Sequence, residues 1–126
     1  MTDRPLGFDT LAIHAGTAPD PATGARQVPI YQTTAYVFRD ADHAAKLFNL
    51  QEVGYIYSRL TNPTVSALAN RVVALEGGAG GIACSSGHAA QIMALFPLMQ
   101  PGRNVVASTR LYGGTIQQFS NTIRKF

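Results

Sequence analysis

The sequence predicts an α/β fold in which a parallel-rich sheet is flanked by helices and preceded by an N-terminal arm. Two short apolar runs, at 80–86 and 104–108, alternate with helical patterns at 88–99 and 115–126. Apolar strands joined by helices are typical of a parallel sheet that is covered on both faces. Because two parallel strands do not close a core alone, we expect these elements to begin a larger domain.

The chain before this pattern has the composition of an arm. Residues 1–36 are rich in Pro, Gly, Thr and Asp, with turn residues at 19–25 and extended chain at 28–38. We therefore place the arm at 1–61 and the start of an incomplete domain at 62–126.

Capping residues predict two helices before the first apolar run. Asp40 can cap a short helix over residues 41–50. Asn62 has the character of an N-cap, with Pro63 at the first helical position. Apolar residues at helical spacing follow as far as Glu76, where two glycines end the pattern.

Composition indicates a globular chain. Hydrophobic residues make up 46% of its 126 residues and charged residues 13%, which is apolar enough for a core. The ten Lys and Arg residues are dispersed, so the net charge of +3 does not indicate a nucleic-acid partner. No apolar run approaches the roughly 20 residues of a membrane span, so we expect a cytoplasmic protein. Cys84 is the single cysteine, which excludes an internal disulfide and is typical of a small buried hydrophobe.

Acidic residues are unevenly distributed along the chain. All seven lie at or before Glu76, and the sequence stops at Phe126 within a helical pattern that has no cap. Complete domains seldom divide in this way, so we expect a fragment of a larger protein.

The stretch GYIYSRLTNPT, residues 54–64, places two tyrosines and an arginine just ahead of the second helix. In an extended segment Tyr55, Tyr57 and Arg59 alternate, so their side chains point the same way. Phenol hydroxyls and a guanidinium that face one direction can clamp a phosphate or a carboxylate. An edge strand with aromatic cross-strand packing is the alternative interpretation.

The small-residue loop CSSGHA, residues 84–89, lies where a strand would end and a helix begin, and backbone amides at such a point favour an anion. A match to a dinucleotide fingerprint at Gly78, Gly80 and Ala83 is spurious, because it precedes the strand instead of following it. No lysine has the setting of a P-loop lysine. A phosphate site therefore remains the first interpretation of this loop.

Two other chemistries fit the loop less well. Ser85 resembles the nucleophile of a hydrolase elbow, but no acidic residue follows it to complete a triad. A metal site is also not indicated, because His14, His43 and His88 lack ligand spacing.

Tyr112 follows the second apolar run, before two glycines. Because parallel strands end at the same edge of a sheet, we expect Tyr112 on the same side as an anion nest formed by Ser86, Gly87 and His88. A phosphate beside an aromatic face describes a phosphorylated ring. The alternative is a turn tyrosine that packs on its own helix.

These residues resemble the N-terminal part of the Cys/Met metabolism family of pyridoxal-phosphate enzymes, which have fold type I. Within the family the resemblance is greatest to the O-acetylhomoserine sulfhydrylases. The matching stretches, which span nearly all of residues 10–119, are TLAIHAG, VPIYQTTAYVF, DADHAAKLFNLQEVGYIYSRLTNPT, ALEGG, SSGHAAQ and LYGGT.

The resemblance implies a role for each candidate residue in binding pyridoxal 5'-phosphate. It implies that Gly87 and His88, next to Ser86, give the phosphate backbone N–H groups. It also implies that Tyr112 stacks on the pyridine ring and is the catalytic residue of this part of the site. Many relatives have Met where His88 stands, which leaves a role for its main chain. The Tyr57 and Arg59 pair is implied to hold the phosphate in the neighbouring subunit, so the arm would serve dimerisation.

For the complete enzyme the resemblance implies replacement of the acetate of O-acetyl-L-homoserine by sulfide, giving homocysteine, in a homotetramer built as a dimer of dimers. The family's Schiff-base lysine, in a Ser-x-Thr-Lys context, and the aspartate that pairs with the pyridine nitrogen have no match here. We therefore expect the 126-residue chain alone to be inactive. The alternatives are an O-succinylhomoserine sulfhydrylase, a cystathionine γ-synthase, a methionine γ-lyase, or a non-catalytic phosphate-binding domain.

Overall fold

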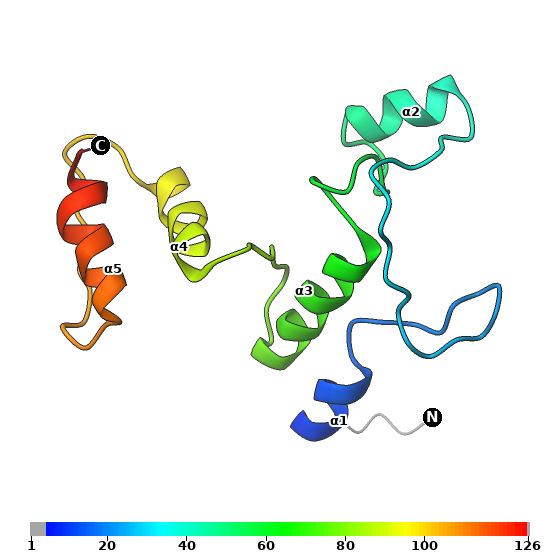
Figure 1. Cartoon of the computed structure of the whole chain (residues 1–126), viewed down its shortest axis with the longest axis horizontal. Helices are drawn as coiled ribbons and strands as arrows, with labels where there is room; N and C mark the ends of the chain where they lie inside the picture. Colours follow the sequence, from blue (N-terminus) through cyan, green and yellow to red (C-terminus); the bar gives the residue numbers. More distant parts are fainter. Residues whose placement is uncertain (1–4, 126) are drawn as a thin grey trace. The chain divides into compact units, whose positions relative to one another are not determined.

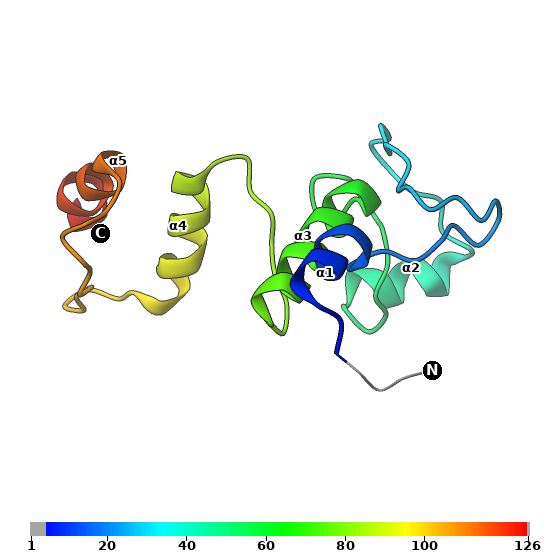
Figure 2. The same cartoon turned by 90° about the horizontal axis from the view of Figure 1, so that it is seen from below.

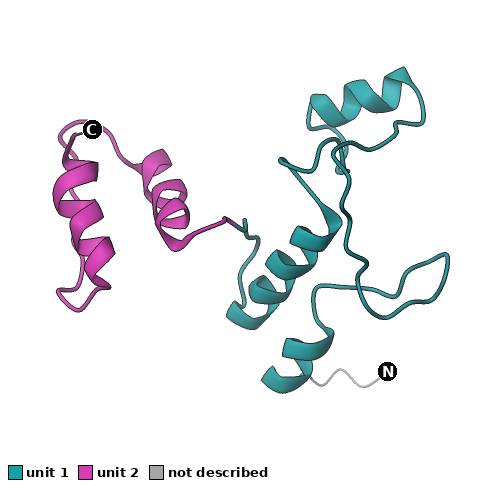
Figure 3. Cartoon of the chain, viewed as in Figure 1, with its two compact units in different colours: residues 1–83 teal, residues 84–126 magenta. Residues whose placement is uncertain are grey.

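The computed structural model describes residues 5–125 of the chain. They form two compact units, one that ends at Ala83 and one that begins at Cys84 (Figure 3). The first unit includes residues from both sides of the predicted arm boundary at 61/62. That boundary, which separates segments by role and not by packing, stays a prediction.

The first unit contains three helices, α1 (Phe8–His14), α2 (Ala41–Phe48) and α3 (Pro63–Glu76). Helix α1 packs against α3, as both Figure 1 and Figure 2 show. Where the chain leaves α1, the Arg71 Nε donates to the carbonyl of Ala15 at 3.0 Å. A Cβ on Gly16 would lie 2.5 Å from the backbone nitrogen of Arg71, so glycine permits this close approach.

Helix α1 is a feature that the sequence interpretation missed, because the arm was expected to contain only turns and extended chain. The helix has seven residues, Phe8–His14, and makes no side-chain cap. Isolated helices of this length are marginal, so its packing on α3 stabilises it more than its own propensity does.

The predicted caps of α2 and α3 are confirmed. The Asp40 carboxylate accepts from the His43 amide at 2.7 Å, and the Asn62 side chain accepts from the Thr64 amide at 2.9 Å. Pro63 stands at the start of α3, and Gly77 ends it with φ +64°. Local chemistry at the helix ends therefore determined both helices.

Helix α2 ends in the same way as α3 but without a glycine. Leu50 has a φ of +56°. The Gln51 amide donates to the Lys46 carbonyl at 2.9 Å and the Leu50 amide to the Leu47 carbonyl at 3.1 Å. This pair of bonds is a Schellman motif, with leucine in the left-handed position that usually holds glycine.

The second unit contains α4 (Gly87–Leu95) followed by a 3₁₀ turn (Phe96–Leu98), and then α5 (Gly113–Gln117). Helix α5 continues as a π-helical segment (Gln118–Thr122) and a last 3₁₀ turn (Ile123–Lys125). Both helical patterns predicted after residue 86 are confirmed. Cys84, expected to be buried, is half-buried, and its Sγ lies 3.3 Å from the Met93 Sδ.

Neither apolar run that was expected as a strand is paired within residues 5–125. In this part of the chain the β contacts reduce to an isolated antiparallel bridge between Ala35 and Tyr57. At the end of the first run Ser86 is extended, with φ −156° and ψ 155°. A strand requires a hydrogen-bonded neighbour, so an extended run without one does not count as a strand.

Few side chains are buried in either unit. Among the described residues, Leu47 is the buried apolar side chain, and Asn62 and Thr115 are the buried polar ones. Large apolar side chains such as Val37 and Val106 are exposed. Within residues 5–125 no helix has the length and apolar character needed to span a bilayer.

Candidate functional site

The segment that carries Tyr57 and Arg59 is hydrogen-bonded to residues 34–36, an earlier part of the arm. The Ser58 amide donates to the Thr34 carbonyl at 2.9 Å, and the Tyr36 amide to the Ile56 carbonyl at 3.3 Å. These two bonds flank the bridge between residues 35 and 57. The expected extended chain therefore reaches as far as Tyr57.

Arg59 lies beyond this extended part, in a turn. The amides of Leu60 and Thr61 both donate to the Tyr57 carbonyl, at 2.9 and 3.1 Å. The guanidinium carbon of Arg59 nevertheless lies 5.5 Å from the centre of the Tyr57 ring, within cation–π range. The two candidate clamp residues are thus adjacent, but by a turn and not by strand alternation.

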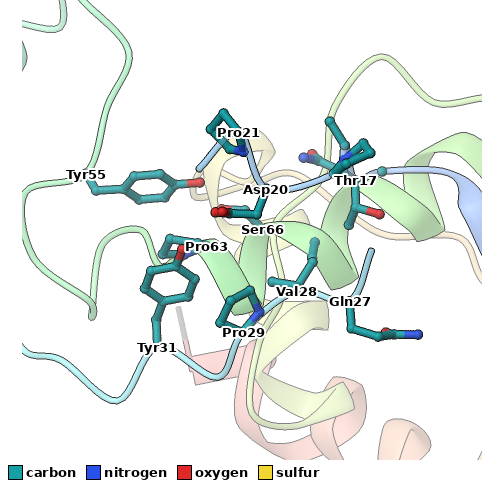
Figure 4. A pocket seen from close by; sticks show the side chains of 15 residues that line it. Thr17, Asp20, Pro21, Gln27, Val28, Pro29, Tyr31, Tyr55, Pro63 and Ser66 are labelled. Carbon is teal, nitrogen blue, oxygen red and sulfur yellow. The ribbon is translucent and has the colours of Figure 1, made fainter. Parts of the chain in front are cut away.

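Tyr55, the third residue of the predicted clamp segment, has different neighbours from Tyr57 and Arg59. Its ring packs against Tyr36, with centroids 5.3 Å apart. Together with Tyr31, it faces a hollow of about 320 Å³ beside the first turn of α3 (Figure 4). The hollow is also lined by Asp20, whose pKa is held below its ordinary value because the Thr23 hydroxyl and amide donate to the carboxylate.

The predicted anion nest lies at the N-terminus of α4. The Ser86 Oγ accepts from the Ala89 amide at 3.2 Å, and the Ser86 carbonyl accepts from the Ala90 amide at 3.0 Å. The amides of Gly87 and His88 donate to no atom of the described chain. Two backbone donors at a helix N-terminus are therefore free to bind an anion.

Tyr112 and His88 come together in the second unit, although they are far apart in the sequence. Their ring centroids are 6.1 Å apart, with planes inclined at 42°. A Cβ on Gly114 would lie 2.7 Å from Tyr112 Cε1 and 2.9 Å from the His88 ring. Glycine at position 114 thus permits both rings to approach the backbone closely. The Tyr112 side chain itself is 77% exposed.

Hydrogen bonds between α4 and the helical segment that begins with α5 hold these two rings near one another. The Gln91 Nε2 donates to the Oγ1 of Thr115 at 2.8 Å, and the Gln118 Nε2 donates to the His88 carbonyl at 3.2 Å. Thr115 is only 4% exposed. Sequence reasoning missed these three residues, although polar side chains within apolar helices are a signal for such contacts.

The predicted site residues divide between the two units. Tyr57 and Arg59 belong to the first, while the nest and Tyr112 belong to the second. Within each unit the predicted site residues lie near one another, Tyr57 with Arg59 and His88 with Tyr112. Ser85, the candidate hydrolase nucleophile, is exposed and precedes the nest.

Comparison with known proteins decides the family. The family model of the Cys/Met metabolism PLP-dependent enzymes matches residues 9–126. The chain belongs to this family. The predicted family is confirmed, and with it the dependence on pyridoxal phosphate that defines its members.

Individual members of the family share about half of their residues with the chain. O-acetyl-L-homoserine sulfhydrylase 1 of Thermus thermophilus is 55% identical over 120 residues, which is 95% of the chain and 28% of that relative. The homocysteine synthase of Schizosaccharomyces pombe is 55% identical over 116 residues, covering 92% of the chain and 27% of that relative. The chain therefore spans little more than a quarter of the length of these Cys/Met metabolism enzymes.

Solved structures of this family agree with the fold. A Campylobacter jejuni protein assigned as an O-acetylhomoserine (thiol)-lyase matches with a TM-score of 0.90 and 47% identity, over 97% of the chain and 30% of its own. That structure holds N'-pyridoxyl-lysine-5'-monophosphate. MetB of Corynebacterium glutamicum matches with a TM-score of 0.83 and 36% identity, over 95% of the chain and 29% of its own. The predicted class, the first part of a fold type I PLP-dependent enzyme, is confirmed.

The residues of the second unit fit the cofactor of the family. Pyridoxal phosphate presents an anionic phosphate and a flat ring. The Gly87 and His88 amides offer free donors of the kind that a phosphate needs, and Tyr112 is exposed enough for its ring to lie against a flat group.

Proposed function

We propose that the full-length protein is a PLP-dependent transferase that converts O-acetyl-L-homoserine and sulfide to L-homocysteine and acetate, in methionine and cysteine biosynthesis. The observation that carries this proposal is the 55% identity to the Thermus thermophilus sulfhydrylase across 95% of the chain. Pyridoxal phosphate, when bound, supplies an electron sink that makes exchange at the γ-carbon possible.

The residues of this chain would hold the cofactor, and Tyr112 would be the catalytic residue that the chain contributes. The Gly87 and His88 amides, oriented by the Ser86 cap, would donate to the phosphate. Tyr112, with its exposed ring, would lie against the pyridine face.

Tyr57 and Arg59 would complete the phosphate site with a phenol and a guanidinium. We propose that they do so in a neighbouring subunit, so that each site is shared between two copies in a dimer of dimers. Support comes from their exposure, since the Tyr57 side chain is 39% exposed, and from the lack of a hydrogen-bond partner for the Arg59 guanidinium among residues 5–125. The protein would work in the cytoplasm, on small-molecule substrates.

The reaction is tested with the full-length protein, loaded with pyridoxal phosphate and supplied with sulfide. Homocysteine formation from O-acetyl-L-homoserine, measured beside O-succinyl-L-homoserine, is expected to be much faster with the acetyl ester. A preference for the succinyl ester would contradict the proposed substrate, and so would a preference for cysteine over sulfide as the thiol. Absence of any turnover in a protein that binds the cofactor would instead favour a non-catalytic phosphate-binding domain.

A further inference from the structure

We propose that Asn62 is a positioning residue for the phosphate clamp, acting through the turn that carries Arg59. We call residues 57–62 the clamp turn. The inference rests on the proposed function, because it takes Tyr57 and Arg59 as phosphate-binding groups. It adds a role for a residue that the sequence marks only as a helix cap.

Arg59 depends on the clamp turn for its position. Its guanidinium makes no hydrogen bond within residues 5–125, and its central carbon lies 5.5 Å from the centre of the Tyr57 ring. A long, exposed cation of this kind has many rotamers, so only its backbone can be fixed in advance. Whatever fixes the clamp turn therefore determines where the guanidinium can reach.

The side chain of Asn62 closes the clamp turn. Its Nδ2 donates to the Ser58 Oγ at 3.0 Å, which joins the last residue of the turn to the second. Inside this link the Leu60 and Thr61 amides donate to the Tyr57 carbonyl. The backbone of Arg59 thus lies within a turn that these hydrogen bonds close.

The same amide nitrogen also ties the turn to an earlier part of the arm, at Tyr31. Nδ2 also donates to the Tyr31 carbonyl at 2.9 Å, so both of its hydrogens are used. Ser58 continues the network, since its hydroxyl donates to the Thr33 carbonyl and lies 3.2 Å from the Tyr36 hydroxyl.

The remaining atom of the amide, Oδ1, caps α3 by accepting from the Thr64 amide at 2.9 Å. Asn62 is only 7% exposed, so water does not readily replace the bonds that its side chain makes. One buried side chain therefore connects the arm, the clamp turn and helix α3. A residue that only caps a helix needs the oxygen alone; the two donations by nitrogen are what a positioning role requires.

Substitution to aspartate separates the two roles. Asn62→Asp keeps an oxygen that can cap α3, because Asp and Asn are equally good caps, but it removes both donations. Ser58→Ala gives a second test without a new charge, since it removes the acceptor within the turn. Asp40→Ala is the matched control: it deletes the N-cap of α2, in the same unit, without touching the clamp turn.

The measurement is retention of pyridoxal phosphate by the full-length protein, compared with retention of pyridoxal, which lacks the phosphate. Asn62→Asp and Ser58→Ala are expected to speed the loss of pyridoxal phosphate by roughly tenfold to a hundredfold, by analogy with the range for groups that orient the ligands of a metal ion. Pyridoxal retention should change little. Asp40→Ala should leave both rates near those of the unaltered protein.

Arg59→Ala, measured in parallel, separates failure of the clamp from failure of this inference. If Arg59→Ala does not speed the loss of pyridoxal phosphate, the clamp role is wrong and the positioning role falls with it. If Arg59→Ala acts but neither Asn62→Asp nor Ser58→Ala does, only the positioning role is overturned. Equal losses of pyridoxal and pyridoxal phosphate in the Asn62 and Ser58 variants would indicate general destabilisation and also overturn it. Should Asn62→Asp not fold, Ser58→Ala decides alone.

Discussion

At the scale of single residues, sequence and structure agree most clearly at the ends of helices, where the backbone geometry favours particular residue types. Asp40, Asn62, Pro63 and Gly77 occupy cap positions that their chemistry predicts, and the structure confirms all four. The proximity of Tyr112 to the nest was expected from the edge that two parallel strands would share, but the hydrogen bonds of Gln91 and Gln118 that link the two helical segments had no such local signal. They depend on packing between helices, which no short stretch of sequence encodes.

Leu50 and Gly77 allow a matched test of the left-handed cap position. Leu50 has φ +56° and is 90% exposed, so its side chain contributes little packing in the described chain. Leu50→Gly is expected to raise the free energy of unfolding by about 0.5–1 kcal/mol, because relief of the left-handed strain exceeds the entropic cost of glycine.

Gly77→Ala should show the opposite sign. Gly77 has φ +64°, and no atom lies within 4 Å of a Cβ added there. Only the backbone strain of alanine in this conformation therefore remains, and it lowers the free energy of unfolding by about 1 kcal/mol. Chemical denaturation of the full-length protein measures both changes. A Leu50→Gly variant less stable than the parent would show that leucine contributes packing in the assembled protein.

Gly114→Ala tests the close approach of the Tyr112 and His88 rings to the backbone at Gly114. The added methyl group would meet both rings, at 2.7 and 2.9 Å, and force at least one of them to move. We expect cofactor binding to weaken by about 1 kcal/mol, the scale of one aromatic contact, with little change in unfolding. Cofactor titration followed by absorbance measures this.

Gly113→Ala is the control, because nothing lies within 4 Å of a Cβ at that position. It should leave cofactor affinity unchanged. Equal weakening by both substitutions would indicate a general effect on α5 and contradict the specific role of Gly114.

At the scale of elements, the helices with capping signals were predictable, and the packing partners of the elements were not. The helices α2 and α3 have strong capping signals, whereas α1 has seven residues and no side-chain cap, and was missed. The two apolar runs have the composition of strands, but a strand exists only where another segment supplies its hydrogen bonds. Local sequence therefore predicts which segments extend, and pairing depends on the rest of the fold.

The contact between α4 and α5 makes a prediction at this scale. Thr115→Val keeps the shape of the side chain but removes the acceptor for the Gln91 Nε2. Because Thr115 is 4% exposed, we expect a loss of about 1–3 kcal/mol in the free energy of unfolding, the cost of an unpaired buried donor.

Asn121→Ala serves as the comparison, since it removes an exposed hydrogen bond to Gln117 in the same helical segment. Its effect on unfolding should be below about 0.5 kcal/mol. Similar losses in the two variants, measured by denaturation of the full-length protein, would show that burial of Thr115 is not what makes its hydrogen bond matter.

At the scale of the whole molecule, the site is expected to form between subunits. If Tyr57 and Arg59 serve a neighbouring copy, loss of Arg59 should weaken cofactor retention by roughly 2–5 kcal/mol, the range for truncating one partner of a buried charge pair. Mixing subunits distinguishes a clamp shared between copies from a clamp within one copy. An Arg59→Ala subunit is combined with a subunit that lacks the Schiff-base lysine.

A shared clamp places both defects in one site of the mixed dimer and leaves the other site intact, because an isologous interface exchanges the same patch in both directions. Activity should therefore reappear on mixing, although each variant alone is inactive. With a clamp inside each subunit, every site keeps one defect. Mixed dimers without activity would thus contradict the shared arrangement.

The bridge between Ala35 and Tyr57 also has a consequence for how the chain can vary in length. It brings two points of the backbone together. The segment between them, which includes α2, is therefore a long loop whose two ends are joined. Lengthening a loop whose ends are already joined adds little closure entropy, about 0.6 kcal/mol for each doubling. Insertions between residues 37 and 55 that keep Leu47 buried should consequently leave the clamp turn in place, so this loop is where the protein can acquire new surface without altering its phosphate site.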